Sequence, residues 1–335
     1  MNNNFGKMKK IEKKSVKPIK NPVKSSIKHN LKFVHRYSVF NVDLSEILIF
    51  DDKKILTDAI DTKGIKIYDS KFNLIYKNSK HKITFVKIID NDNLLLLNEK
   101  NELITLNIKE NKSKILFTFK ENFAKFLYIN KNLLVTASEE LKHGIKIWRG
   151  DETGSYQIVT VIKFPEQDET ALSIIYYYEE KNLLVTNDTE YGKVNFFDFE
   201  SFQTKDSLIL KDDDELFEFD IFCPIKNDVI IFGLGDTLML YDFKEKKILQ
   251  VKLFKYCIGE VKYIKEKDII LISGGDHNYQ QTDIYMYDSN FNELQIIPKV
   301  SFMGIHGFVY YDKNEKEKYV LVCSTSGEMI VYSIH

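Results

Sequence analysis

The residues that could do chemistry are seven scattered histidines, one glycine-rich segment and one acidic cluster. A metal or catalytic site needs several such side chains to converge, and His143, His277 and His306 could meet only at one face of the fold. Gly233-Leu234-Gly235-Asp236 resembles part of a nucleotide-binding loop, but it lies between two strand-like segments, so a hairpin turn is the better interpretation. The chain also lacks the HExxH, Walker and GxSxG motifs and the sialidase Asp-box. We therefore expect no catalytic residues, no metal and no cofactor.

The acidic cluster runs from Asp212 to Glu215 and continues with Glu218 and Asp220. A calcium-binding loop would need acidic residues at alternate positions and a distal glutamate, and this segment has neither. We interpret it as a solvated connection between two structural units. An acidic docking patch is the alternative.

The elements that must position these residues are repeated strands. Ile145-Lys146-Ile147-Trp148-Arg149 alternates along the chain and closes with an aromatic and then a polar residue, a pattern typical of a half-buried strand. The pattern recurs six times, starting at Ile65, Leu103, Val194, Leu238, Ile284 and Met329. The steps between starts are 38 to 49 residues, and repeats of that length made of short strands indicate one blade of a β-propeller per step.

Each repeat also contains a second, almost continuously apolar strand ahead of the patterned one. Such runs are typical of strands that are buried on both faces, as stacked blades require. These second strands are Ile55 to Ile60, Leu94 to Leu97, Leu133 to Ala137, Leu183 to Thr186, Val229 to Phe232, Ile269 to Ser273 and Tyr319 to Cys323. The sequence therefore predicts an all-β, seven-bladed propeller.

The two ends of the chain predict how the ring closes. From Gly307 onward there is room for only three strands, whereas Lys32 to Val39 alternates like a strand but precedes the first full repeat. An incomplete last blade would expose an open sheet edge, so we expect the N-terminal strand to complete it. The expected domains are a tail, residues 1–31, and a propeller, residues 32–335.

The repeats resemble those of the WD40 family. IKIWR stands where that family has an apolar strand ending in Trp-Asp, and IKIYD, VNFFD, LMLYD and IYMYD match it with Tyr or Phe in place of Trp. The resemblance also implies a hydrogen-bonded second-strand hydroxyl, at Thr57, Thr136, Thr186, Ser273 and Ser324. The family's Gly-His dipeptide is missing, with Ser79-Lys80-His81 as the nearest trace. A kelch-like propeller is a minor alternative, suggested by the single Gly274-Gly275 doublet.

Charge is distributed unequally along the chain. Residues 1–32 carry ten lysines and one acid, a net charge of +9, so a chain of net charge −1 leaves −10 for the remainder. The tail is expected to be disordered, with nuclear localisation, weak contact with nucleic acid or anionic surfaces, and organelle targeting as functional alternatives. The acidic remainder should repel phosphate.

The expected compartment is the cytoplasm, with the nucleus as the alternative. Cys223, Cys257 and Cys323 are odd in number and far apart, which is typical of reduced thiols. The N-terminus lacks the apolar core of a signal peptide, and no apolar run approaches the length of a membrane helix.

The resemblance implies a noncatalytic scaffold that binds other proteins, as a subunit of a larger assembly. One alternative is a propeller that binds phosphoinositides or anionic surfaces, although the Phe-Arg-Arg-Gly motif of that class is absent. A propeller enzyme is a less favoured alternative.

The predicted partner site lies where turns between second and third strands are long. The turns of blades two and five are short, whereas those of blades three, four and six extend over 138–144, 187–192 and 274–282. Loops on a rigid scaffold commonly carry recognition, and aromatic side chains often anchor interfaces. The candidate residues are His143, Tyr191, His277, Tyr279 and Gln280, extended by Phe302, Met303 and His306 on the connection into blade seven.

Overall fold

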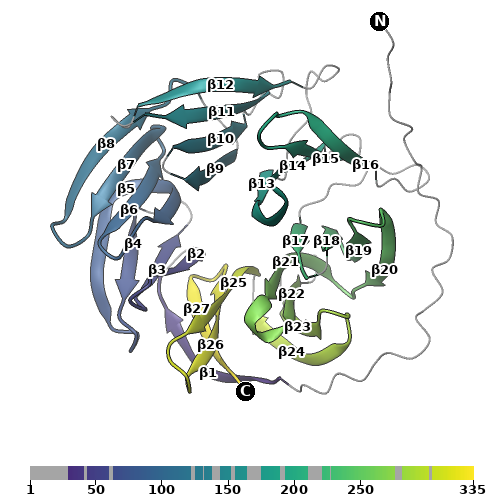
Figure 1. Ribbon diagram of the computed structural model, residues 1–335. Coiled ribbons are helices and arrows are strands. Elements are labelled where there is room, and N and C mark those ends of the chain that lie inside the picture. Colours follow the sequence, from purple (N-terminus) through teal and green to yellow (C-terminus); the bar gives the residue numbers. More distant parts are fainter. Residues whose placement is uncertain are drawn as a thin grey trace, which may run out of the picture.

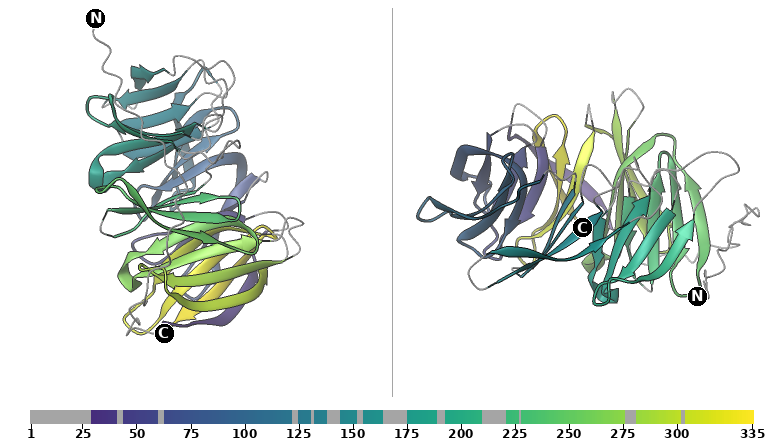
Figure 2. Two further views of the ribbon diagram at one scale, coloured as in Figure 1. Left: turned by 90° about the vertical axis from the view of Figure 1, so that its right-hand side faces the viewer. Right: turned by 90° about the horizontal axis from the view of Figure 1, so that it is seen from above.

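The computed structural model describes residues 29–40, 44–59, 63–121, 125–130, 132–137, 144–151, 155–163, 175–188, 193–209, 221–226, 228–275, 281–301 and 304–335. They form seven antiparallel blades of four strands around a central opening, which confirms the predicted propeller (Figure 1). Figure 2 shows the blades side by side in two further views. The helices of the described part are two single turns, η2 (Glu179–Lys181) and η3 (Lys265–Lys267), neither long enough to cross a membrane.

The first two blades share one long strand. Blade 1 contains β2 (Leu44–Ile49), β3 (Ile55–Ala59), β4 (Lys63–Tyr68) and the first half of β5 (Leu74–Ile88). Blade 2 contains the second half of β5 with β6 (Asn93–Asn98), β7 (Glu102–Asn107) and β8 (Lys112–Thr118). β5 pairs with β4 up to Lys82 and with β6 from Ile83. Because β5 contains no Gly or Pro, nothing in its sequence interrupts the strand between the blades.

Blades 3 to 6 repeat the same order, from the inner strand to the outer one. Blade 3 is β9 (Lys125–Asn130), β10 (Leu133–Ala137), β11 (Ile145–Gly150) and β12 (Tyr156–Ile162). Blade 4 is β13 (Ile175–Tyr178), β14 (Leu183–Asp188), β15 (Lys193–Asp198) and β16 (Thr204–Ile209). Blade 5 is β17 (Ile221–Pro224), β18 (Val229–Leu234), β19 (Thr237–Asp242) and β20 (Lys247–Leu253). Blade 6 is β21 (Cys257–Ile264), β22 (Ile269–Gly275), β23 (Thr282–Asp288) and β24 (Glu293–Ser301).

Blade 7 closes the ring with both ends of the chain, as predicted. Its strands are β25 (Ile305–Asp312), β26 (Lys318–Ser324), β27 (Glu328–Ile334) and, on the outside, β1 (Leu31–Ser38). β1 pairs with β27 over its whole length, and its first residue, Leu31, is buried. Gln295 of blade 6 accepts a hydrogen bond from the Leu31 N–H at 2.8 Å and donates one to its carbonyl at 3.1 Å. The closing strand is therefore fixed to two blades.

The hydrophobic core lies between blades. Each buried cluster of the described residues combines side chains from two neighbouring blades, and these clusters follow one another around the whole ring. Side chains of a strand point alternately to its two faces, so Ile269 and Leu271 pack toward blade 7 while Ile270 and Ile272 pack toward blade 5. This alternation explains why the second strands are apolar at every position.

The aromatic residue near the end of the third strand packs against the preceding blade in six blades, whereas blade 2 has Leu106 at this position. Trp148 lies in a cluster with residues of blade 2, and Tyr332 lies in one with residues of blade 6. The same holds for Tyr68, Phe197, Tyr241 and Tyr287. Burying one aromatic side chain of this size contributes roughly 2 to 3 kcal/mol. The repeated aromatic thus stabilises contacts between blades.

The acidic residue after that aromatic organises the next turn. Asp288 Oδ1 accepts hydrogen bonds from the backbone N–H groups of Asn290 and Asn292, both at 2.9 Å. Asp69 and Asp198 make equivalent bonds in blades 1 and 4. An Asx turn of this kind explains why the repeat ends in Asp, since the carboxylate satisfies turn N–H groups that have no ladder partner.

Candidate functional site

The connections between blades and the turns between second and third strands share one face of the ring, which we call the connection face. The carbonyl of Gly327, in the turn before β27, accepts a hydrogen bond of 2.9 Å from the N–H of Val39. Val39 lies after β1, where the chain continues to blade 1. The N–H of Thr325, in the same turn as Gly327, donates at 3.2 Å to the carbonyl of Gly304, on the connection into blade 7. The partner site was predicted for turns and connections of this kind.

Most of the predicted partner-binding residues lie outside the described residues. They are His143, Tyr191, His277, Tyr279, Gln280, Phe302 and Met303, and their role stays a prediction. The acidic cluster that begins at Asp212 also lies outside the described ranges, between β16 and β17. His306 is described. It was expected on the connection into blade seven, whereas the structure has it as the second residue of β25. Its side chain is exposed at the wall of a cavity.

That cavity lies along the central opening. It has a volume of about 700 Å³ and is lined by the inner strands β2, β5, β21 and β25 of blades 1, 2, 6 and 7. Its acidic lining residues are Glu46, Asp58, Glu260 and Glu266, and its basic ones are Lys262 and Lys265. Phe85 and Phe308 add aromatic surface. Acidic groups therefore outnumber lysines, and a small cationic group is the kind of ligand that this lining favours.

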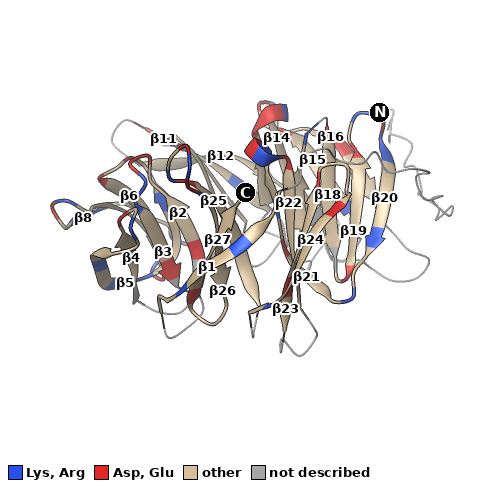
Figure 3. Ribbon diagram, turned by 90° about the horizontal axis from the view of Figure 1, so that it is seen from below, with Lys and Arg blue, Asp and Glu red and all other residues tan. Residues whose placement is uncertain are grey.

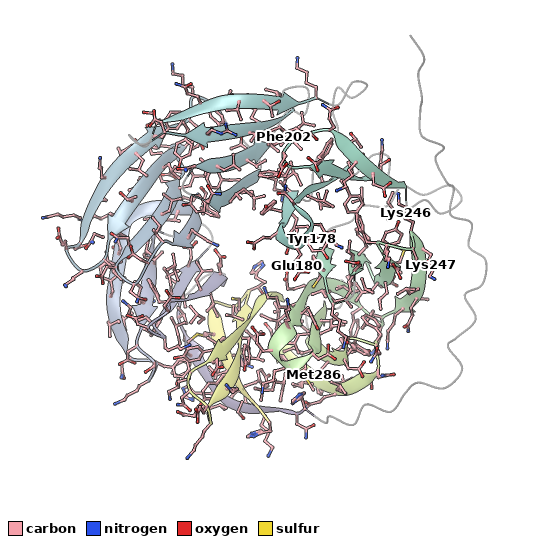
Figure 4. All side chains as sticks on the ribbon, in the orientation of Figure 1. Tyr178, Glu180, Phe202, Lys246, Lys247 and Met286 are labelled. Atoms are coloured by element: carbon pink, nitrogen blue, oxygen red, sulfur yellow. The ribbon has the colours of Figure 1, made fainter. Side chains whose placement is uncertain are left out.

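Blade 4 faces the same opening from the other side. Figure 4 shows Tyr178 and Glu180 beside the opening, whereas Lys246 and Lys247 lie at the outer rim. Glu180 pairs with Lys265 at 3.1 Å, which joins η2 of blade 4 to η3 of blade 6. Both side chains are exposed, so the pair adds little stability. The ion pair nevertheless engages Lys265, one of the two lysines that line the cavity.

The four inner strands around the cavity have the same irregularity. The pairing register with the second strand skips one residue in each strand, at Ser45, Thr84, Gly259 and His306. The residue after the skip is paired again, and these residues are Glu46, Phe85, Glu260 and Gly307. A bulge re-aims side chains at a sheet edge. Glu46 and Glu260 therefore occupy equivalent positions in blades 1 and 6.

Burial dominates the electrostatics of these two glutamates. It raises the pKa of Glu46 to about 7, although the charges of Lys87 and Lys262 act to lower it. Burial likewise raises the pKa of Glu260 to about 7, against the charge of Lys262. Burial also raises the pKa of the Cys323 thiol, and the charges of Glu46 and Glu260 raise it further.

These glutamates were not predicted from the sequence, because the repeated patterns lie in the second and third strands and not in the inner ones. A signal was present: Glu46, Phe85 and Glu260 each stand nine residues before the first apolar residue of their second strand, Ile55, Leu94 and Ile269. Within the described residues, no group of three or more His, Cys, Asp or Glu side chains could hold a metal ion.

The polar network implied by the WD40 resemblance survives in blade 3. Trp148 Nε1 donates to Thr136 Oγ1 at 2.9 Å in the buried core. At the equivalent positions, Thr57 Oγ1 donates to the Lys66 carbonyl at 3.4 Å, and Ser324 Oγ lies 2.6 Å from Ser301 Oγ. The Thr186 and Ser273 hydroxyls have no hydrogen-bond partner among the described residues. Tyr and Phe in place of Trp cannot donate in the same way, which explains the loss.

No model of a known protein family matches the sequence. The search of curated proteins finds no match either. The fold assignment therefore rests on the blades themselves.

Proposed function

We propose that this protein is a noncatalytic WD40-like propeller that binds other proteins and serves as a platform for their assembly. The WD40-like assignment is supported by the seven blades and by the Trp148–Thr136 hydrogen bond. The platform role is supported by a fold in which rigid blades present connections of unequal length on one face.

The observation that carries this proposal is the contrast between uniform blades and variable turns on the connection face. β18 and β19 are joined by Gly235 and Asp236 alone, whereas β10 and β11 are separated by residues 138–144. The two pairs of strands are otherwise alike in length and pairing. Extra residues in a turn add little to the blade core, so a recognition role is a reason to keep them.

Basic and acidic residues are interspersed along the blades, as Figure 3 shows from below. Such a surface suits a protein partner better than a phosphate backbone, which favours a continuous basic patch. We therefore place protein binding ahead of nucleic-acid or anionic-lipid binding.

The test is affinity purification from the native cell with crosslinking, comparing wild type with the Tyr191→Ala, Tyr279→Ala double variant. The double variant should keep its melting temperature and lose at least one copurifying protein. The matched control is Glu315→Ala with Lys316→Ala, in the exposed turn between β25 and β26 on the opposite face. Unaltered recovery of every partner by the tyrosine variant, with loss in the control, would place the binding surface on the opposite face.

A further inference from the structure

Three consecutive blades form a slot in the cavity wall. Going around the ring, blades 6, 7 and 1 place Glu260, Gly307 and Glu46 at the equivalent inner-strand position. All three residues line the cavity, and Cys323 lies behind Gly307. We call Glu260, Gly307 and Glu46 the Glu-Gly-Glu slot. The central position lacks a side chain, so residue 307 places no side chain between Glu46 and Glu260.

Packing does not explain the glycine in the middle of the slot. A Cβ atom added at Gly307 would meet only Cys323 Sγ, at the ordinary contact distance of 3.8 Å. Gly307 is also not among the glycines with positive φ, so its backbone does not need glycine. Glycine inside a strand costs about 0.5 to 1 kcal/mol relative to alanine, and it often marks the close approach of a ligand.

The flanking carboxylates make no direct ion pair among the described residues, and the charges of Lys87 and Lys262 offset only part of the cost of burying them. Neither Glu46 nor Glu260 makes a hydrogen bond or an ion pair with another residue of the described part. Burial raises the pKa of both groups, which means that the ionised form of each is disfavoured relative to a carboxylate in water. A bound cation would remove this penalty, because an opposite charge stabilises the ionised form.

We propose that the Glu-Gly-Glu slot binds the ammonium group of a lysine side chain. An ammonium group is compact and has three N–H donors, which it can donate to carboxylates on either side of Gly307. A guanidinium group is planar and broader, and it matches a single carboxylate edge-on. The butyl stem of lysine would pack on apolar lining residues such as Phe85 and Phe308.

The lysine has two possible sources, the tail of this chain and a partner protein. Residues 1–28 carry nine lysines and precede β1 in the sequence, and β1 is the outer strand of the same blade 7 that holds Gly307. Twenty-eight extended residues span roughly 90 Å, and four neighbouring strands span only about 15 Å, so the tail can reach the slot. The inference goes beyond the proposed function, because the slot can bind a lysine whether or not a protein partner occupies the connection face.

The first experiment measures binding of an ammonium probe, N-acetyl-lysine-methylamide, to the full chain by NMR titration. A full chain whose nine lysines in residues 1–28 are replaced by glutamine removes competition from the tail. The Glu46→Gln, Glu260→Gln variant should bind the probe at least tenfold more weakly, and Gly307→Val should do the same by filling the slot. Glu110→Gln, on an exposed turn at the outer side of blade 2, is the matched control. Its affinity for the probe should be within twofold of that of the protein without this substitution.

The second experiment identifies the source by carbodiimide coupling, which joins a carboxylate to an amine in contact, followed by mass spectrometry. Coupling of Glu46 or Glu260 to a lysine of residues 1–28, reduced by Gly307→Val, assigns the slot to the tail. Coupling to a copurified partner, with none to the tail, assigns it to the partner. Equal probe binding by the wild type, Gly307→Val and the double glutamine variant, each with its melting temperature retained, would overturn the proposal. Tighter binding of Ca²⁺ than of the probe would also overturn it.

Discussion

Trp148 Nε1 donates a hydrogen bond of 2.9 Å to Thr136 Oγ1, which joins the third strand of blade 3 diagonally to the second. The indole ring also contacts Phe119 of the preceding blade edge-on, with ring centroids 5.1 Å apart. One side chain therefore connects strands within a blade and seals the contact with its neighbour.

Replacing Trp148 with Phe should keep much of the aromatic packing but leave the buried Thr136 hydroxyl without its donor. We expect the free energy of unfolding to fall by about 1 to 3 kcal/mol, the usual cost of an unsatisfied buried polar group. Urea unfolding measures this change. Thr136→Val combined with Trp148→Phe should cost less than the two single changes added together, and strict additivity would argue against the hydrogen bond.

The turn aspartates can be tested at Asp288, whose carboxylate accepts two backbone N–H bonds and the side-chain amide of Asn292. Asp288→Ala should lower the free energy of unfolding by about 2 kcal/mol, because these N–H groups lose a charged acceptor. Asp288→Asn should cost less, since Asn107 already fills this position in blade 2 and accepts from the Glu110 N–H at 2.7 Å. Thermal unfolding of both variants measures the difference, and equal losses would contradict the Asx-turn explanation.

Two of these aspartates also predict how acid affects the fold. Hydrogen bonds from Asn73 lower the pKa of Asp69, and hydrogen bonds from Ser201 lower that of Asp198. A lowered pKa in the folded state means that the stabilisation is present above the unfolded pKa, about 3.9, and is lost as pH falls through the folded one. Stability measured from pH 5 down to pH 2.5 should fall less steeply for Asp69→Asn and Asp198→Asn than for the wild type.

The cavity glutamates predict an opposite pH dependence near neutrality. The pKa of Glu46 and Glu260 is raised to about 7, so the folded state holds protons that the unfolded state releases near pH 4.3. Their contribution to stability is complete below pH 4.3 and is lost as pH rises through about 7. Melting temperatures of the Glu46→Gln, Glu260→Gln variant should therefore decline less than those of the wild type between pH 5 and pH 8.

Other charged groups near these glutamates must be unchanged in that comparison. Those that face them from neighbouring elements are Lys87, Lys262, Asp58, His306 and the Cys323 thiol. Asp58→Asn is the matched control, because it lines the same cavity. If Asp58→Asn flattened the profile as much as the double glutamine variant, the assignment to Glu46 and Glu260 would be wrong.

Ring closure predicts different outcomes for two deletions. Removing residues 1–28 leaves β1 intact and should leave the melting temperature unchanged. Removing residues 1–39 also removes buried Leu31 and Val39 and the ion pair of Arg36 with Glu328 at 2.9 Å, and it exposes the edge of β27. The longer deletion should therefore melt earlier or aggregate. Identical melting of both deletions and the full chain would show that β1 is not needed for closure.

The sequence alone determined the fold because the relevant signals are local and repeated. Alternation at Ile145 to Trp148, and the doubly apolar second strands, depend only on the period of a strand and on burial between blades. The closing strand was predictable for the same reason, since a blade with three strands leaves an edge that one unassigned strand can fill.

Only the tertiary structure brought Glu260, Gly307 and Glu46 together. They are far apart in the chain, and they become neighbours because closure through β1 and β27 places blade 7 between blades 6 and 1. The bulges that align them depend on pairing register, which a single strand does not encode on its own. Their raised pKa values likewise come from burial by neighbouring blades, a property of the closed ring and not of any one repeat.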